Sequence, residues 1–203
     1  MTRMAGLKMA AASLSLLGAN IAAAAIAWDE TVDGELSSDP AAPTAVAFAD
    51  GVNTVNGAIG QGDVRDYFTF TIPDGQQLVG VLLQSYVDLD TGGDGDRGWY
   101  SVSAGSTSAV PAFDNPNEFL GGTHLDPQPA GTDILALLIT NSLTGTGVTG
   151  PLGAGTYTWL VQQTGAELGG YSLDFVVAPV PVPAAFWLMA SGMAGLAGLR
   201  RRR

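Results

Sequence analysis

Four aspartates in a glycine-rich stretch between positions 88 and 96 have the clearest potential for chemistry. They are Asp88, Asp90, Asp94 and Asp96. Glycines let the backbone turn sharply, and Ca²⁺ accepts about six to eight oxygen ligands with loose geometry. The stretch does not fit an EF-hand, because positions 5 and 12 counted from Asp88 are Gly92 and Trp99. The four aspartates are thus a candidate site for calcium as a cofactor, with a solvated hairpin loop as the favoured alternative.

Catalytic residues are hard to find in this chain. His124 is the single histidine, so a histidine-ligated metal cluster is excluded, and no nucleophile elbow surrounds it. We expect it to lie in a loop without a catalytic role. The 19 acidic residues could still supply a carboxylate pair for glycoside hydrolysis. We predict that the protein is not an enzyme, with a secreted polysaccharide-active hydrolase as the alternative.

Four aromatic residues lie next to polar residues in the middle of the chain. They are Trp99, Tyr100, Phe113 and Phe119. Aromatic rings beside carboxylates and amides can stack on sugar rings, which would make an exopolysaccharide a partner. Packing in the hydrophobic core is the favoured alternative for all four.

The charge of the chain is divided unevenly between its ends and its interior. The formal net charge is -11, but only Arg65 and Arg97 oppose 19 acidic residues between residues 28 and 199, which leaves -17 there. Such a surface repels phosphate backbones, so nucleic acid is excluded as a partner. There is no cysteine, so the folded part depends on its core alone.

Residues 1–27 have the layout of a secretory signal peptide. Two early positive charges precede an apolar centre and a small-residue exit at Ala25 and Ala27. This pattern predicts cleavage after Ala27 by signal peptidase, following insertion into the secretion translocon. Cleavage after Ala23, Ala24 or Ala25 fits the same rule nearly as well, and an uncleaved helical anchor is the alternative.

The C-terminal residues 184–199 form an uncharged, apolar run of 16 residues. A helix of that length measures roughly 24 Å, somewhat less than the hydrocarbon core of about 30 Å. We therefore predict a transmembrane helix that spans the inner membrane marginally. The charged cluster that follows consists of Arg200, Arg201, Arg202 and Arg203. It should stay cytoplasmic, which places the preceding domain outside.

A short proline-containing motif stands directly before this helix. It consists of Val180, Pro181, Val182, Pro183 and Ala184. The order of motif, helix and arginines resembles the C-terminal sorting signals of the PEP-CTERM family, in particular their VPLPA variant, although Val182 stands where that variant has leucine. The resemblance implies that an exosortase, a membrane-embedded cysteine protease-transpeptidase, cuts at the motif and passes the domain to the cell surface.

The region between the two ends shows strand periodicity. In residues 66–72, for example, Phe68, Phe70 and Ile72 share one face. Strands are predicted at 44–48, 52–59, 66–72, 78–86, 99–103, 134–140, 156–163 and 170–177. We therefore expect an all-β protein with a single jelly-roll-like sandwich of about eight strands at 28–178, followed by the sorting signal at 179–203.

A second resemblance rests on the strand sequences themselves. Residues 63–72, 75–81, 152–161 and 169–173 look like the opening and closing strands of bacterial pre-peptidase C-terminal domains. The resemblance implies a jelly-roll-like sandwich with an accessory binding role and often calcium. Together these patterns predict an exported cell-surface or extracellular-matrix protein without catalytic activity.

Overall fold

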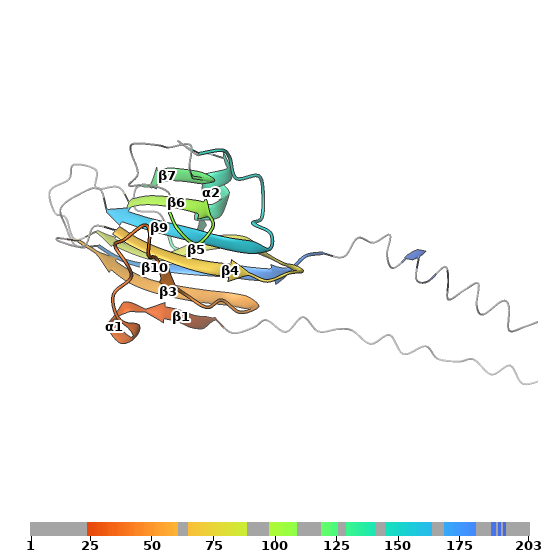
Figure 1. Ribbon diagram of the computed structural model, residues 1–203, viewed down its shortest axis with the longest axis horizontal. Helices are drawn as coiled ribbons and strands as arrows, with labels where there is room; N and C mark the ends of the chain where they lie inside the picture. Colours follow the sequence, from red (N-terminus) through yellow and green to blue (C-terminus); the bar gives the residue numbers. More distant parts are fainter. Residues whose placement is uncertain are drawn as a thin grey trace, which may run out of the picture.

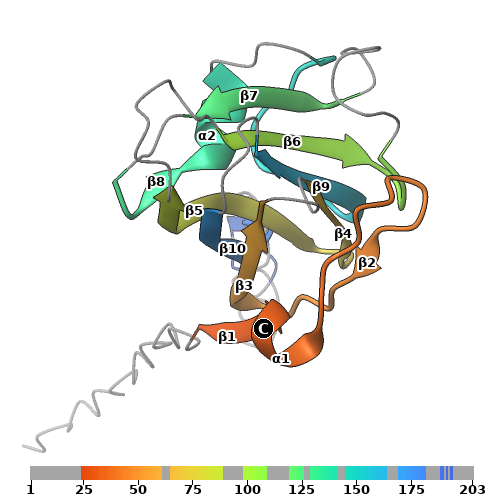
Figure 2. The same cartoon turned by 90° about the vertical axis from the view of Figure 1, so that its left-hand side faces the viewer.

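The structure is a computed structural model and describes most of the central region of the chain. The described residues are 24–60, 65–88, 98–108, 119–125, 129–140, 145–163 and 169–181, with Leu188, Met189, Ser191 and Met193. Over these residues two β-sheets face each other, as Figures 1 and 2 show. The predicted all-β sandwich is thereby confirmed.

Each of the two sheets contains five strands. The first has the order β1-β3-β10-β5-β8, formed by Ala25–Asp29, Gly51–Ile59, Gly169–Pro179, Gln76–Asp88 and Thr132–Asp133. The second has the order β2-β4-β9-β6-β7, formed by Thr44–Ala45, Arg65–Ile72, Gly155–Gln163, Gly98–Ala104 and Gly121–Leu125. Seven of these ten described strands correspond to predicted ones, whereas β1, β7 and the two-residue edge strand β8 were not expected.

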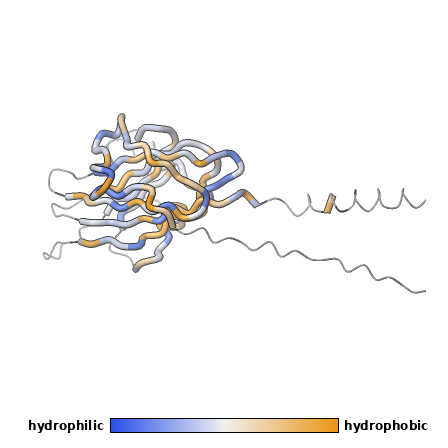
Figure 3. The backbone as a smooth tube through the Cα atoms, turned by 90° about the horizontal axis from the view of Figure 1, so that it is seen from below, coloured by the Kyte–Doolittle hydropathy of each residue, from blue (hydrophilic) through white to orange (hydrophobic). Residues whose placement is uncertain are grey.

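The core lies between the sheets and is rich in aromatic rings. Phe175 of β10 packs against Phe68 and Phe70 of β4, with ring centroids 5.6 and 5.4 Å apart, and against Trp159 of β9 at 5.3 Å. All four side chains are buried. Burial of one such side chain contributes about 1.5–3 kcal/mol, so this cluster holds the two sheets together. Figure 3 shows apolar segments running through the sandwich.

The segment at 134–140 is a helix, and the predicted buried strand there is wrong. Helix α2 spans Ile134–Thr140, and its buried residues Ile134, Leu135 and Leu138 follow helical spacing. Asp133 promotes this helix because its Oδ1 accepts a hydrogen bond from the backbone N–H of Ala136 at 3.2 Å. A short uninterrupted apolar run does not distinguish the two structures by its pattern alone.

The described chain enters and leaves the sandwich at the same end. In the parallel pair of β1 and β3, Ala25 lies opposite Asn53, and in the antiparallel pair of β10 and β3, Val177 lies opposite Gly51. Both partners belong to the first residues of β3, so the start of β1 and the finish of β10 lie close together. Figure 1 shows both on the right-hand side.

The predicted membrane helix at 184–199 lies mostly outside the described residues. Only Leu188, Met189, Ser191 and Met193 are described there, and all four are exposed. Across the described parts of the chain, no helix is long and apolar enough to cross a membrane.

Candidate functional site

The predicted calcium loop falls almost entirely outside the described residues. Asp90, Asp94 and Asp96 are not described, and Asp88 is the last residue of β5, where its backbone lies opposite Gly169. A calcium site in this loop therefore stays a prediction.

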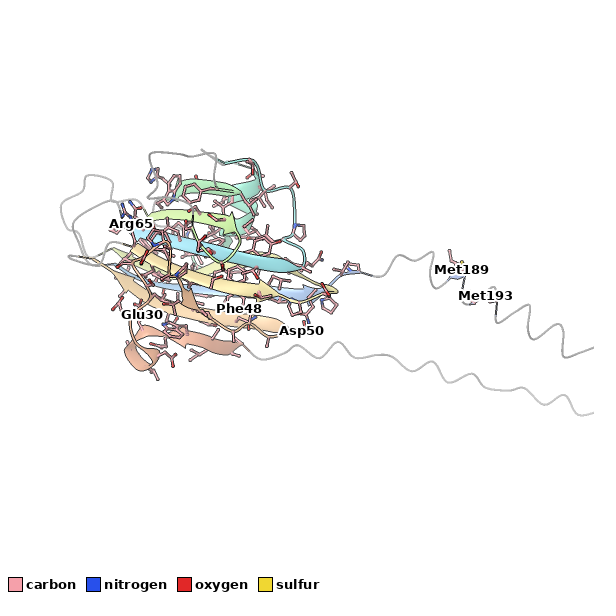
Figure 4. The ribbon with its side chains drawn as sticks, viewed as in Figure 1. Glu30, Phe48, Asp50, Arg65, Met189 and Met193 are labelled. Atoms are coloured by element: carbon pink, nitrogen blue, oxygen red, sulfur yellow. The ribbon has the colours of Figure 1, made fainter. Side chains whose placement is uncertain are left out.

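A different set of carboxylates converges at one end of the sandwich. Glu30, Glu35 and Asp66 each place a carboxylate oxygen within 4.8 Å of the others. Glu30 begins the short helix α1, Glu30–Asp33, Glu35 follows that helix, and Asp66 belongs to β4. Burial increases from the exposed Glu35 through Glu30 to the fully buried Asp66. Figure 4 labels Glu30 at this end.

Glu30 is held in place by the backbone around it. Its Oε1 accepts a hydrogen bond from the N–H of Leu36 at 3.0 Å, and its Oε2 accepts one from the N–H of Ala58 at 2.6 Å. Helix α1 is in turn capped by Asp29, whose Oδ1 accepts from the N–H of Thr31. The hydrogen bonds to Thr31 and then to Asn56 lower the pKa of Asp29. These contacts fasten the α1 segment to β3.

Asp66 is hydrogen-bonded across the interior of the sandwich. The Oη of Tyr171 in β10 donates to Oδ2 of Asp66 at 2.7 Å, which links the two sheets. Burial, followed by the neighbouring Asp66 carboxylate, raises the pKa of Tyr171 well above its usual value. Gly57 of β3 gives the phenol its space, because a Cβ at that position would overlap the Tyr171 ring.

Three converging carboxylates offer a cluster of oxygen atoms to a hard cation. Oxygen ligands of this kind suit Ca²⁺, which tolerates irregular arrangements and carboxylates bound through one or two oxygens. Asp66 has no exposed surface, so it is not accessible to a polymer substrate. No local sequence pattern indicates this cluster, because Glu30 and Asp66 are far apart along the chain.

The central aromatic residues belong to the core where they are described. Trp99, Tyr100 and Phe119 are nearly completely buried, and the rings of Trp99 and Phe119 lie 6.3 Å apart. The core-packing alternative is confirmed for these three. Phe113 lies outside the described residues.

His124 lies in a strand, and the expectation of a loop is wrong for this residue. It belongs to β7 opposite Trp99 of β6, and the two rings meet edge to face at 4.7 Å. The imidazole thus packs against a buried aromatic ring of the neighbouring strand.

The predicted processing positions are described in part. The backbone N–H of Val180 donates to the carbonyl of Gly75 at 2.8 Å, and Pro181 is the last residue before an undescribed stretch. The remaining positions are outside the described residues: Val182, Pro183, Ala184, Arg200, Arg201, Arg202 and Arg203.

The predicted cleavage position at the N-terminus falls inside a strand. Ala25 and Ala27 both belong to β1, Ala25–Asp29, which pairs with β3. Cleavage after Ala27 would remove three of the five residues of β1. Cleavage after Ala23 or Ala24 would leave the strand whole.

Among the comparisons with known proteins, only those with solved structures give matches. No family model matches the chain, and no curated protein matches it. Among solved structures, it is similar to the pre-peptidase C-terminal domain of a collagenase from Bacillus anthracis, with 10% identity, a TM-score of 0.36, and coverage of 66% of this chain and 92% of that one. The fold assignment therefore rests on the two sheets themselves.

Proposed function

We propose that this protein is exported across the inner membrane and delivered to the cell surface or the extracellular matrix as a non-enzymatic β-sandwich. The observation that supports this proposal is the position of the two ends of the described sandwich. The first residues of β1 and the last residues of β10 lie at the same end of the sandwich, next to the start of β3. A domain held by a membrane segment at each end must present both ends to the same membrane.

The proposed sorting signal follows the sandwich without a linker. Val180, the first residue of the motif, is still hydrogen-bonded to Gly75, and its side chain is 47% exposed. An exosortase that cuts at Val180 to Ala184 would then release the sandwich almost without a tail. Until that cut, the helix at 184–199 and the four terminal arginines would hold the domain on the outer side of the inner membrane.

Fractionation of cells that express the full chain tests this proposal. We expect the uncut protein in the inner membrane, the sandwich accessible to added protease from the outer side, and a smaller product outside the cell. Replacement of Arg200 to Arg203 by glutamate should reduce membrane retention. Full-length protein in the cytosol with both ends intact would contradict the proposal.

Signal peptidase should act before β1 for the strand to be complete. We propose cleavage after Ala23 or Ala24, because this product keeps the pairing of Ala25 with Asn53. The intact mass of the exported protein measures this position directly. A product that begins at Trp28 would contradict this position without affecting the proposal of export.

Calcium binding is a second proposed function, and the convergence of Glu30, Glu35 and Asp66 is the observation that favours it. If the three carboxylates bind Ca²⁺, millimolar Ca²⁺ should raise the melting temperature of the full chain, and Mg²⁺ should do so less. The variant Glu35→Gln should reduce the rise in melting temperature caused by Ca²⁺, since Glu35 is the exposed residue of the three carboxylates. Loss of the effect in a variant with Asp90, Asp94 and Asp96 replaced by asparagine would place calcium in the loop instead.

A further inference from the structure

A groove on the second sheet has the properties of a binding site. It encloses about 490 Å³ and is open to solvent. Its floor is formed by Thr69 and Thr71 of β4 and Thr156 of β9, with the Ala45–Phe48 segment on one side and Ser106 on the other. The volume lies within the usual range of small-molecule sites, about 300–1,000 Å³.

The groove exists because one chain segment separates from β4. Strand β2 pairs with β4 for only two residues, ending with Ala45 opposite Thr69. After a last hydrogen bond from the N–H of Val46 to the carbonyl of Thr69, the chain turns away from β4. Thr71, two residues further along β4, is exposed and has no partner in β2.

The separated segment is fastened to the core. Phe48 stacks on Phe70, with ring centroids 4.6 Å apart, and Figure 4 shows Phe48 toward the end of the sandwich that also carries Asp50. The buried side chain of Asn53 accepts a hydrogen bond from the N–H of Ala49 and donates to its carbonyl. These contacts hold the wall apart from the floor before any ligand arrives, which lowers the entropic cost of binding.

Hydroxyl groups supply the polar chemistry of the floor. The Oγ1 atoms of Thr71 and Thr156 lie 3.0 Å apart, so one donates to the other and the second keeps its proton for an outside acceptor. Thr69 Oγ1 donates to the carbonyl of Tyr157 and keeps its lone pairs for an outside donor. Groups that both donate and accept match the hydroxyls of a sugar. The methyl groups of Ala45 and Ala47 offer apolar contact to its C–H groups.

The absence of charge from the lining defines the class of ligand. None of the nine lining residues is charged, although the chain carries 27 charged side chains, 8 basic and 19 acidic. A uronate or a phosphate would find no cation there, and an amine would find no carboxylate. We propose that the groove binds a neutral polysaccharide through the hydroxyls of Thr69, Thr71 and Thr156. This rests on the proposed surface function and names the partner it would contact.

Affinity electrophoresis of the full chain in a mild detergent tests the site. Native gels would contain dextran, galactomannan or hydroxyethylcellulose as neutral polymers, or polygalacturonate as an anionic one. We expect the protein to migrate more slowly in at least one gel that contains a neutral polymer. In the polygalacturonate gel, its migration should be unchanged. No retardation in any neutral gel, or equal retardation in polygalacturonate, would overturn the proposal.

The double variant Thr71→Val, Thr156→Val removes both hydroxyls of the pair and keeps the β-branched shape that strands favour. Both hydroxyls of the hydrogen-bonded pair are removed together, so no unpaired hydroxyl remains and the fold should be retained. We expect roughly three- to tenfold weaker binding in the double variant. Thr140→Val is the control, because its hydroxyl donates to Ala136 in α2 and lies outside the groove.

A second variant tests whether the polymer lies in the groove. Ala47→Glu adds a longer side chain to the wall at an exposed position, and its bulk should weaken binding without changing the melting temperature. Unchanged retardation in both this variant and the double variant would overturn the assignment of the groove. Export is measured separately by fractionation, so a groove that binds nothing would leave the proposed localisation standing.

Discussion

At the scale of single residues, the hydrogen bond between Tyr171 and Asp66 is a polar link between the two sheets in a largely apolar interior. Tyr171 and Asp66 are both buried, and their hydrogen bond joins β10 of one sheet to β4 of the other. A buried carboxylate is costly unless it accepts hydrogen bonds. The Tyr171–Asp66 pair therefore constrains how the two sheets face each other near the Glu30 carboxylate.

The variant Tyr171→Phe removes the donor and keeps the ring. We expect the free energy of unfolding to fall by about 1–3 kcal/mol, because Asp66 loses a hydrogen bond in the interior. Urea denaturation would measure the free energy of unfolding of both proteins. The control Tyr157→Phe removes a hydroxyl that donates to Gly153 near the surface, and it should cost much less. Equal losses in the two variants would contradict the role of the buried link.

The variant Gly57→Ala tests the space that Tyr171 requires. A Cβ at Gly57 would overlap the Oη and Cζ atoms of Tyr171, so we expect a loss of about 1–3 kcal/mol in stability. Gly153→Ala is the matched control, since an added Cβ meets nothing within 4 Å there. Thermal unfolding of both variants separates steric overlap from the general effect of replacing glycine.

At the scale of elements, Asp133 stabilises the first turn of α2 and its attachment to the first sheet. Its Oδ1 accepts from the N–H of Ala136 in α2 and from the N–H of Val81 in β5, each at 3.2 Å. One carboxylate thus begins the helix and attaches it to the first sheet. In the groove, one side chain likewise holds a segment in place: Asn53 hydrogen-bonds the backbone of Ala49, which directly follows the Ala45–Phe48 segment.

We expect Asp133→Ala to destabilise the protein by about 0.5–2 kcal/mol, the usual effect of losing a helix cap. Asp133→Asn should cost less, because its amide oxygen can still accept both hydrogen bonds. Hydrogen exchange at α2 would report the effect locally. If α2 exchanges equally fast in both variants, the side chain does not act as a cap.

At the scale of the whole molecule, stability should depend on alkaline pH. Burial raises the pKa of Tyr67, Tyr100 and Tyr171 in the folded protein above the value of about 10 in the unfolded chain. The folded state therefore keeps protons that the unfolded state releases. The stability from these groups is fully present below pH 10 or so and is lost as pH rises above it.

Urea denaturation between pH 8 and about 11.5 measures this loss. We expect the free energy of unfolding to be nearly constant up to about pH 9.5 and then to fall, with up to about 1.4 kcal/mol lost per pH unit for each strongly buried tyrosine. Tyr100→Phe should make the fall less steep. A constant value up to the highest pH would contradict the burial of these phenols.

The sequence by itself determined the class of fold and the position of most strands. Alternation of apolar and polar residues is local, so residues 66–72 and 170–177 predicted β4 and β10 correctly. The run at 156–163, which follows Gly155, predicted β9 correctly as well. The expectations of a signal peptide and a sorting signal also come from local pattern, whereas the proposed cleavage after Ala23 or Ala24 comes from the pairing of β1 with β3.

Only the tertiary structure decided which of these elements meet. The pairing of Val55 with Leu173 and the approach of Glu30 to Asp66 join parts of the chain that are far apart in sequence. The same holds for α2, where one apolar run fits a helix or a strand until its neighbours select the helix. Strand periodicity is set by each residue and its immediate neighbours. The carboxylate cluster instead depends on how the α1 segment lies against β4, and the threonine groove depends on where the 45–48 segment leaves β4.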